Sequence, residues 1–326
     1  MGDDIPLSEA MTDSEWLAEL EKLGEEEGYY QPLGDDHAAV YSDDSLDTLL
    51  VYFDSIPNAR ATNPNGLPHP LVVARELGWS HIALFSNATS WFREERVYGY
   101  FDRLIDEGFL EDFERVIFFG VGAGGYAASA FSVAAPGSTV IAVAPQATLD
   151  PTIAGWDDRF HTHRRLNFKD RFGYAPDMLD AAEKSFVVYD PMVELDAMHA
   201  TLFRAPNTDL IRLRNGGAGL GRELMGMNAL RPLFSSAERG TLNPLDFYQS
   251  FRLRQTYLPY LRSLLTRVHT EERHLLTAIL CRAALEKRDS PRLRHHLDLA
   301  VVKLREENRE LPAPAPKRRA RLRPVN

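Results

Sequence analysis

The feature that most restricts the fold is an alternation of short apolar runs with helical patterns along much of the chain. Thr48–Phe53, Arg115–Gly120 and Thr139–Ala144 are apolar at nearly every position instead of every second one, which is typical of strands buried on both faces. Helical patterns such as Gly124–Val133 separate these runs. This order predicts an α/β protein with a mainly parallel sheet and helices on both faces.

Changes of pattern divide the 326 residues into four parts. We expect an acidic helix in residues 1–30, the α/β core in residues 31–238, a small all-α domain in residues 239–311 and a disordered basic tail in residues 312–326. Within the core, about residues 150–183 are too long for a simple connection between two strands. This stretch predicts a lid insertion.

The charge is distributed unevenly along the chain. Residues 1–50 hold 15 acidic residues against the single base Lys22, whereas residues 312–326 hold five basic residues and no acid. The body between them is close to neutral, so it contains no basic stripe of the kind that binds nucleic acid. We expect no nucleic-acid partner. A protein partner bound through the helical domain or the basic tail remains open, beside the simpler reading that charged ends are solvated.

The cysteine and histidine positions bear on compartment and metal binding. Cys281 is the only cysteine, and no apolar run reaches the ~18 residues of a membrane span or the pattern of a secretory signal. These features predict a cytoplasmic protein without a membrane span. His161 and His163 have no third ligand nearby and precede Arg164 and Arg165, so we expect no metal site and no cofactor.

The most informative local pattern is the glycine-rich turn that joins a strand to a helix. Gly120, Gly122 and Gly125 match the G-x-G-x-x-G pattern of dinucleotide-binding folds, but Gln146 stands near the place of the expected acidic residue. The nucleophile elbow G-x-S-x-G of α/β-hydrolases fits Gly120, Gly122 and Gly124 instead. In that alignment Gly122 takes the place of the nucleophilic serine.

The motifs that follow this turn resemble those of one protein group. Residues 120–128, the segment Ala144–Gln146, and then Thr148–Pro151 and Trp156–Phe160 occur in the order found in bacterial α/β-hydrolase-like proteins related to polysaccharide-linked esterases. The resemblance covers about residues 37–235. It implies an α/β-hydrolase-like fold in which a catalytic acid follows the strand after the lid and a catalytic histidine follows the last strand.

Two of the three catalytic positions implied by the resemblance are vacated in this chain. Asp190 occupies the acid position, with Asp196 as a second choice, but Gly122 replaces the nucleophile and Ala218 stands where the histidine is expected. Without a hydroxyl there is no acyl-enzyme, and without an imidazole there is no base to activate serine or water. The elbow is therefore interpreted as degenerate.

Relocated catalysis is the alternative to its loss. Asp196 and His199 are three residues apart and would share a helical face, which makes His199 the best remaining acid/base candidate. A buried structural histidine and a turn-forming Asp190 are the competing interpretations. The amides of Ala123 and of the segment near Ser55 are expected to form an anion-accepting hole even without catalysis.

The combined prediction is a non-catalytic α/β-hydrolase-like protein that binds a small molecule, such as an acyl or sugar ligand, in a pocket that includes Gly122, Ala123, Gln146 and Ser55. A role accessory to polysaccharide or acyl-group metabolism follows only from the resemblance. The alternatives are a divergent esterase or acyltransferase and a nucleotide-binding enzyme that uses the glycine turn. A resemblance to proteins labelled phosphoadenosine phosphosulfate reductases is not supported, because that chemistry needs a reactive thiol and Cys281 lies in an apolar helical stripe.

Overall fold

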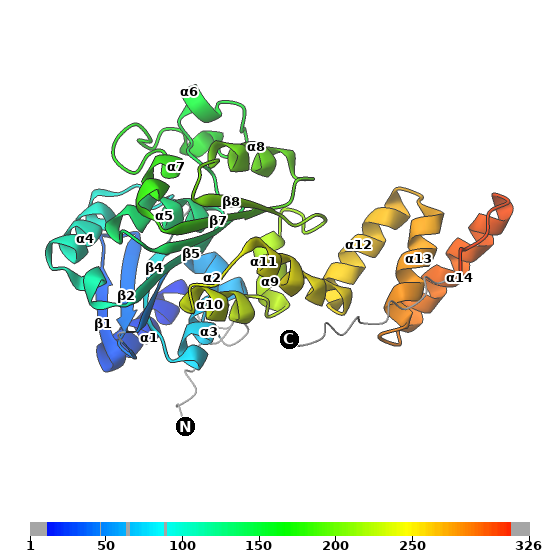
Figure 1. Cartoon of the computed structure of the whole chain (residues 1–326), viewed down its shortest axis with the longest axis horizontal. Helices are drawn as coiled ribbons and strands as arrows, with labels where there is room; N and C mark the ends of the chain where they lie inside the picture. The colour runs from blue at the N-terminus through cyan, green and yellow to red at the C-terminus, as the bar shows by residue number, and fades with distance from the viewer. Residues whose placement is uncertain (1–11, 46, 63–65, 88–89, 314–326) are drawn as a thin grey trace, which may run out of the picture. The chain divides into compact units, whose positions relative to one another are not determined.

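The structure, a computed structural model, describes residues 12–45, 47–62, 66–87 and 90–313 (Figure 1). The chain divides into two compact units: unit 1 ends at Leu253 and unit 2 begins at Arg254. Sequence patterns put the start of the helical domain after residue 238. The helix that follows, Pro244–Ser250, packs on unit 1. Most of the predicted basic tail lies outside the described residues.

The described residues form one sheet of eight strands in the order β1-β2-β4-β3-β5-β6-β7-β8. β2 pairs antiparallel with β1 and β4, and the other neighbours pair in parallel. The strands are β1 Gly28–Pro32, β2 His37–Ser42, β3 Thr48–Ser55, β4 Ser80–Ser86, β5 Arg115–Val121, β6 Thr139–Val143, β7 Lys184–Tyr189 and β8 Thr208–Arg212. The predicted fold class is confirmed by this sheet, its helices and the separate C-terminal helices.

Helices connect and cover the strands. The α-helices of unit 1 are α1 Asp13–Glu27, α2 Ile56–Thr62, α3 His69–Leu77, α4 Glu95–Asp106, α5 Ala123–Phe131, α6 Pro151–Ala154, α7 Ala175–Met178, α8 Glu194–Leu202, α9 Leu220–Gly226, α10 Leu230–Glu238 and α11 Pro244–Ser250. Short 3-10 turns are η1 Phe109–Asp112, η2 Ser132–Ala134, η3 His161–His163, η4 Leu179–Ala181 and, across the unit boundary, η5 Phe251–Gln255.

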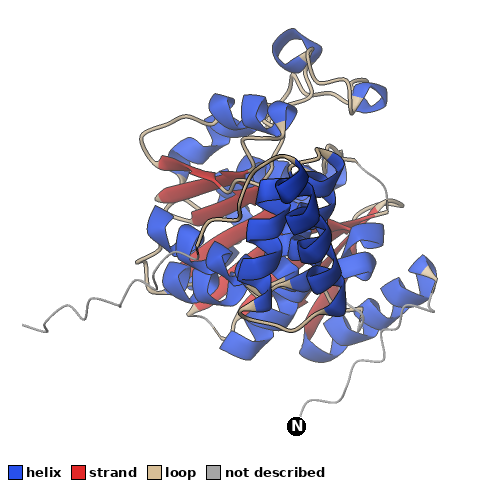
Figure 2. Cartoon of the chain, turned by 90° about the vertical axis from the view of Figure 1, so that its right-hand side faces the viewer, coloured by secondary structure: helices blue, strands red, loops and turns tan. Residues whose placement is uncertain are grey.

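Both faces of the central strands are buried, as their continuous apolar character predicts. On one face Phe53 of β3 stacks on Phe101 of α4 and Phe131 of α5, with ring centroids 5.9 and 5.7 Å away. On the other face Phe119 of β5 packs edge-on against Phe234 of α10 at 5.4 Å. Burial of each such ring contributes roughly 1.5–3 kcal/mol to folding. Figure 2 shows the strands between layers of helix.

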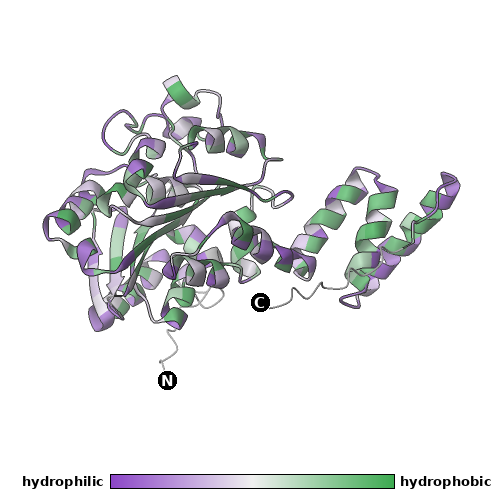
Figure 3. Ribbon diagram, in the orientation of Figure 1, coloured by the Kyte–Doolittle hydropathy of each residue, from purple (hydrophilic) through white to green (hydrophobic). Residues whose placement is uncertain are grey.

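Unit 2 consists of α12 Leu258–Thr270, α13 His274–Leu285 and α14 Pro291–Glu306. α13 packs against both α12 and α14. The small core between α13 and α14 contains Ala278, Ala300 and Leu304, and each helix carries both hydrophobic and hydrophilic residues (Figure 3). Cys281 is buried there, and burial raises the pKa of its thiol to about 11. No helix in the described part of the chain is long and apolar enough to cross a membrane.

Candidate functional site

The turn after β5 is a sharp elbow that points its central residue outward. Gly122 has φ 57° and ψ −118°, and α5 begins at the next residue, Ala123. The Gly122 amide donates to the Val143 carbonyl at 2.8 Å, and the Gly122 carbonyl accepts from the Tyr126 amide at 2.9 Å. These bonds fix the turn between β6 and the first turn of α5. Glycine adopts this backbone conformation freely, whereas other residues do so only under strain.

The flanking glycines are required by close approach of backbone to backbone. A Cβ atom at Gly120 would lie 2.1 Å from the Gly124 carbonyl oxygen, and one at Gly124 would lie 2.2 Å from the Phe53 carbonyl oxygen. A Cβ atom at Gly122 would meet nothing within 4 Å. Small residues on both sides of an exposed central position are the geometry of a nucleophile elbow. The chain has an α/β-hydrolase-like fold.

Comparisons with known proteins were made at three levels. No protein-family model matches the chain, and the search of curated proteins gives no match. Among solved structures, carboxyl esterase 2 of the fungus Tuber melanosporum is 13% identical over 69% of this chain and 83% of its own, with a TM-score of 0.41. An esterase of Pyrobaculum calidifontis is 13% identical over 71% and 92%, with a TM-score of 0.42. Mouse α/β hydrolase domain-containing protein 10 is 11% identical over 57% and 88%, with a TM-score of 0.34. The strand order and the elbow, not these distant similarities, carry the fold assignment.

Asp190, the residue expected at the acid position, directly follows β7 and is 1% exposed. Its Oδ2 accepts from the Gly217 amide at 2.7 Å, and its Oδ1 accepts from the Met192 amide at 2.9 Å. Gly217 belongs to the loop after β8, where the fold would carry its histidine, and the adjacent Ala218 is exposed. The carboxylate therefore holds the backbone of that loop directly, without an imidazole between them.

The end of β3 lies beside the elbow, because Phe53 pairs with Gly120 in the parallel register. The amide of Ser55, expected to help form an anion-accepting hole, instead donates to Asp54 Oδ1 at 2.8 Å. This expectation is corrected: the Ser55 amide is already engaged. The Ala123 amide, the other expected donor, is the first of α5 and has no acceptor among the described residues.

Asp54 is a titratable group at the site that the sequence patterns did not single out. Its carboxylate also accepts from the Asn58 side-chain amide at 2.8 Å and from the Tyr52 hydroxyl. Burial raises the pKa of Asp54 to about 6, although these hydrogen bonds act in the opposite direction. The available signal was its position directly after the apolar run Thr48–Phe53, near the carboxyl end of β3.

His199 lies away from solvent and has both ring nitrogens engaged. Nδ1 accepts from the Ala147 amide at 3.1 Å, so Nε2 carries the proton and donates to Asp157 Oδ2 at 3.0 Å. The His199 and Asp157 side chains are both 0% exposed. Burial lowers the pKa of His199 to about 4, although Asp157 opposes the shift. His199 is neutral at pH 7 and has the contacts of a structural histidine, which favours that interpretation over a role as acid or base.

The expected pairing of Asp196 with His199 does not form. Asp196 Oδ1 instead accepts from Arg159 Nη1 at 2.7 Å, and Arg159 Nη2 also donates to Asp157 at 2.8 Å. The arginine thereby bridges two buried carboxylates, one on α8 and one in the 150–183 segment. Burial raises the pKa of Asp196, and the arginine only partly offsets this. These contacts of Arg159 link the 150–183 segment to α8. They leave neither Asp196 nor Asp157 free to act with His199 as an acid/base pair.

Gln146 is 3% exposed and contributes to packing behind the elbow. Its Oε1 accepts from Trp91 Nε1 at 3.3 Å, and its Nε2 donates to the Ala144 carbonyl at 3.3 Å. Trp91 and its neighbour Phe92 both have positive φ, 50° and 55°. Two bulky residues held in this region indicate a loop whose backbone is fixed by its surroundings. Gln146 is thus held by its contact with this loop, and its place in the pocket stays a prediction.

The 150–183 segment lies between β6 and β7 and is fixed to α5. The Tyr126 hydroxyl, four residues after the elbow, donates to the Phe172 carbonyl at 2.5 Å. Arg93, whose side chain is 1% exposed, donates to the carbonyls of Asn167 and Arg171 at 2.6 and 2.8 Å and pairs with Asp170. The segment is thus anchored to the same helix that begins at the elbow.

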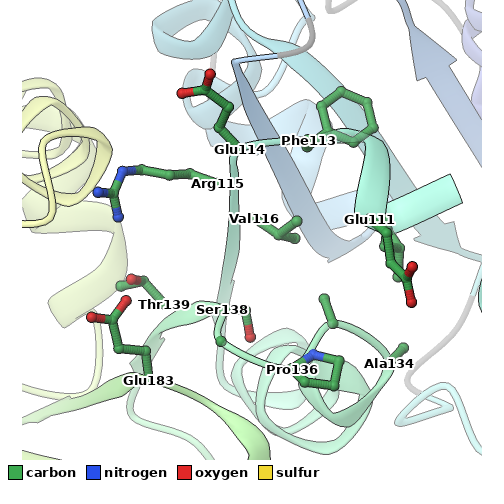
Figure 4. Close-up of a pocket in the computed structure, with 13 residues that line it drawn as sticks. Glu111, Phe113, Glu114, Arg115, Val116, Ala134, Pro136, Ser138, Thr139 and Glu183 are labelled. Atoms are coloured by element: carbon green, nitrogen blue, oxygen red, sulfur yellow. The ribbon is translucent and has the colours of Figure 1, made fainter. Parts of the chain in front are cut away.

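A separate cavity of about 270 Å³ opens where β5 and β6 begin (Figure 4). It therefore lies at the amino-terminal ends of these strands, whereas the elbow follows the carboxyl end of β5. Its wall includes Val116, Pro136 and Ser138. Ligands of parallel sheets bind outside the carboxyl ends of the strands, so this cavity does not belong to the candidate site. The described residues contain no cluster of three or more side chains suited to hold a metal ion.

Proposed function

We propose that the protein binds a small acyl or sugar ligand in front of the elbow and does not hydrolyse it. The observation that carries this proposal is Gly122, which keeps the conformation of a nucleophile elbow and faces open space but has no side chain. The Ala123 amide at the N-terminus of α5 supplies a donor for a carbonyl or carboxylate oxygen. The occupied carboxylate of Asp190 and the buried His199 support loss of catalysis.

The assignment to acyl-group or polysaccharide metabolism, in the cytoplasm, belongs to the same proposal. The metabolic role rests on the sequence resemblance, and the cytoplasmic location rests on the buried free thiol of Cys281. A role in binding another protein is supported by apolar side chains of unit 2 that are exposed, Leu299 at 47% and Val302 at 50%. Deletion of residues 312–326 followed by a pull-down tests that role.

A divergent hydrolase is the second candidate, and Asp54 is the observation that favours it. A buried carboxyl with a pKa near 6 at the carboxyl end of a strand is a general-base candidate. Such an enzyme would hydrolyse short acyl esters with a rate that rises through pH 6 and falls at least a hundredfold in Asp54→Asn. The nucleotide-binding alternative has less support, because Gln146 accepts a hydrogen bond from Trp91 and no acidic residue stands at the end of β6, in residues 144–146.

The deciding experiment combines labelling, turnover and binding. We expect the wild-type protein to resist a fluorophosphonate probe and to leave p-nitrophenyl butyrate unhydrolysed, with Gly122→Ser run beside it. Butyranilide, an uncleaved acyl probe, should bind saturably in isothermal titration. Gly122→Leu should abolish this binding by filling the open space. Gly108→Leu is the matched control, because Gly108 also has positive φ and open space but lies in the turn after α4.

The outcomes separate the non-catalytic proposal from the location of the pocket and from the nucleotide-binding alternative. Labelling or turnover by the wild-type protein overturns the non-catalytic proposal. Labelling would point to a relocated nucleophile, whereas turnover without labelling would direct attention to Asp54 as a general base. Butyranilide binding that survives in Gly122→Leu, or that Gly108→Leu abolishes equally, overturns the location of the pocket. Saturable binding of NAD or ATP that Gly122→Leu removes would favour the nucleotide-binding alternative.

A further inference from the structure

Unit 2 contains a cavity of about 200 Å³ where α12 and α14 begin. Four leucines from the two helices line it: Leu258, Leu261, Leu265 and Leu293. Leu261, Leu265 and Leu293 are buried and Leu258 is half-buried, so the floor of the cavity is apolar. The volume is below the ~300–1,000 Å³ of drug-sized ligand sites, which restricts an occupant to a small molecule or a short chain.

Positive charge surrounds this apolar floor. Arg262 of α12, Arg288 before α14 and Arg292 in its first turn all line the cavity and are exposed. In the described part of unit 2, no carboxylate forms an ion pair with any of these three. Asp289, an acid that also lines the cavity, forms its ion pair with Arg294 at 2.6 Å. Unpaired arginines around a cavity are complementary to an anion.

The start of α14 adds to this positive potential. α14 has 16 residues, and its cap Ser290 accepts from the Leu293 amide. Pro291 takes the first helical position, so the remaining first-turn amides carry the partial positive charge of the helix end at the cavity. Three arginines and the helix end therefore add positive charge to the lining of a leucine-rich cavity.

We propose that this cavity binds an amphiphilic monoanion: a carboxylate with a short or medium unbranched apolar chain. The chain would lie on the four leucines, and the carboxylate would accept hydrogen bonds from the arginines. A hydrophilic anion leaves the apolar floor unused, and a neutral lipid leaves the arginines without a partner. The site lies in unit 2, is independent of the elbow, and does not rest on the function proposed above.

The test is isothermal titration of the full-length protein with octanoate below its micelle concentration. We expect saturable binding of one octanoate at this site, and no saturable binding of acetate, octylamine or octanol. Arg262→Glu and Arg292→Glu should each weaken octanoate binding at least tenfold. Arg305→Glu, an equally exposed arginine of α14 outside the cavity, should leave it unchanged. Leu258→Trp should also weaken octanoate binding, because the larger ring occupies the chain position.

Other results overturn the proposal. Equal weakening by Arg305→Glu would mean that overall charge, and not the cavity, attracts the anion. Octanoate binding that is lost in Gly122→Leu but kept in Arg262→Glu would assign the ligand to the elbow instead. Octylamine binding as tight as octanoate binding would show an apolar pocket without charge selection. Co-sedimentation with phosphatidylglycerol vesicles in the absence of octanoate binding would indicate a membrane-contact surface.

Discussion

The three glycines of the elbow should respond very differently to the same added methyl group. At Gly122 the methyl group has open space, so Gly122→Ala costs only backbone strain of about 1–3 kcal/mol. The lower entropy of the unfolded alanine chain offsets about 0.4–1 kcal/mol of this. We expect a net loss of about 1–2 kcal/mol in the free energy of unfolding.

At Gly120 and Gly124 the methyl group would lie 2.1 and 2.2 Å from backbone oxygens. No flexible side chain can move aside, so β3, β5 or α5 must shift. Because overpacking a core commonly costs 1–3 kcal/mol and here acts on backbone, we expect Gly120→Ala and Gly124→Ala to lose about 3 kcal/mol or more. The chain holds four tryptophans, Trp16, Trp79, Trp91 and Trp156, and all precede unit 2.

Tryptophan fluorescence during urea unfolding therefore reports on unit 1 alone. Gly108→Ala is the control, because φ is 69° there and a Cβ atom also meets nothing within 4 Å. Its loss should be no greater than that of Gly122→Ala, because Gly108 lies in the left-handed helical region with ψ 12°, whereas Gly122 has ψ −118°. If Gly122→Ala is as destabilising as Gly124→Ala, the open space in front of the elbow does not exist and the reasoning for a ligand pocket fails.

Three further predictions concern the contacts around the site. Tyr126→Phe removes two buried hydrogen bonds of the hydroxyl, the one donated to the Phe172 carbonyl and the one accepted from Arg93 Nη1. It should lower the free energy of unfolding by about 1–3 kcal/mol and speed limited proteolysis within residues 150–183; unchanged cleavage would contradict the anchoring role. As pH falls from 6.5 to 4, the His199 side chain takes up a proton in the unfolded protein but stays neutral in the folded protein. This should remove about 3 kcal/mol of stability, seen as a steeper pH slope in the wild type than in His199→Gln. Asp190→Ala should raise hydrogen exchange at the Gly217 amide at least tenfold, while equal protection in both proteins would exclude the bond.

Much of the sheet could be predicted because its strands carry their own signal. The runs around Phe53, Phe119 and Ala142 are apolar on both faces, and each coincides with a strand. β1 was missed, because residues 1–30 were expected to form an acidic helix. This edge strand is half-exposed, pairs only with β2 and contains Pro32, so nothing in its composition distinguishes it from a turn.

The elbow could be predicted because its determinants are adjacent in sequence, whereas the contacts of His199 could not. The spacing of Asp196 and His199 indicated a pair on one helical face, but the partner of His199 is Asp157, 42 residues earlier in the chain. Asp196 forms its ion pair with Arg159 instead of with His199. Such pairing depends on how the 150–183 segment returns over α8, and periodicity contains no information on that path.

The bond between Asp190 and the Gly217 amide affects how readily this chain could become a hydrolase. In a working triad the acid orients an imidazole. Here the Asp190 carboxylate instead accepts a hydrogen bond from the Gly217 amide and so holds the loop itself. A serine at Gly122 and a histidine at Ala218 would still lack a free acid, and freeing Asp190 would loosen the loop that must present the histidine. If the protein is non-catalytic, as proposed, a triad on this elbow would need coordinated changes at Gly122, Ala218 and Asp190, and freeing Asp190 would cost stability. The carboxylate that a triad would need for its histidine is thus the one that holds the loop after β8 in place.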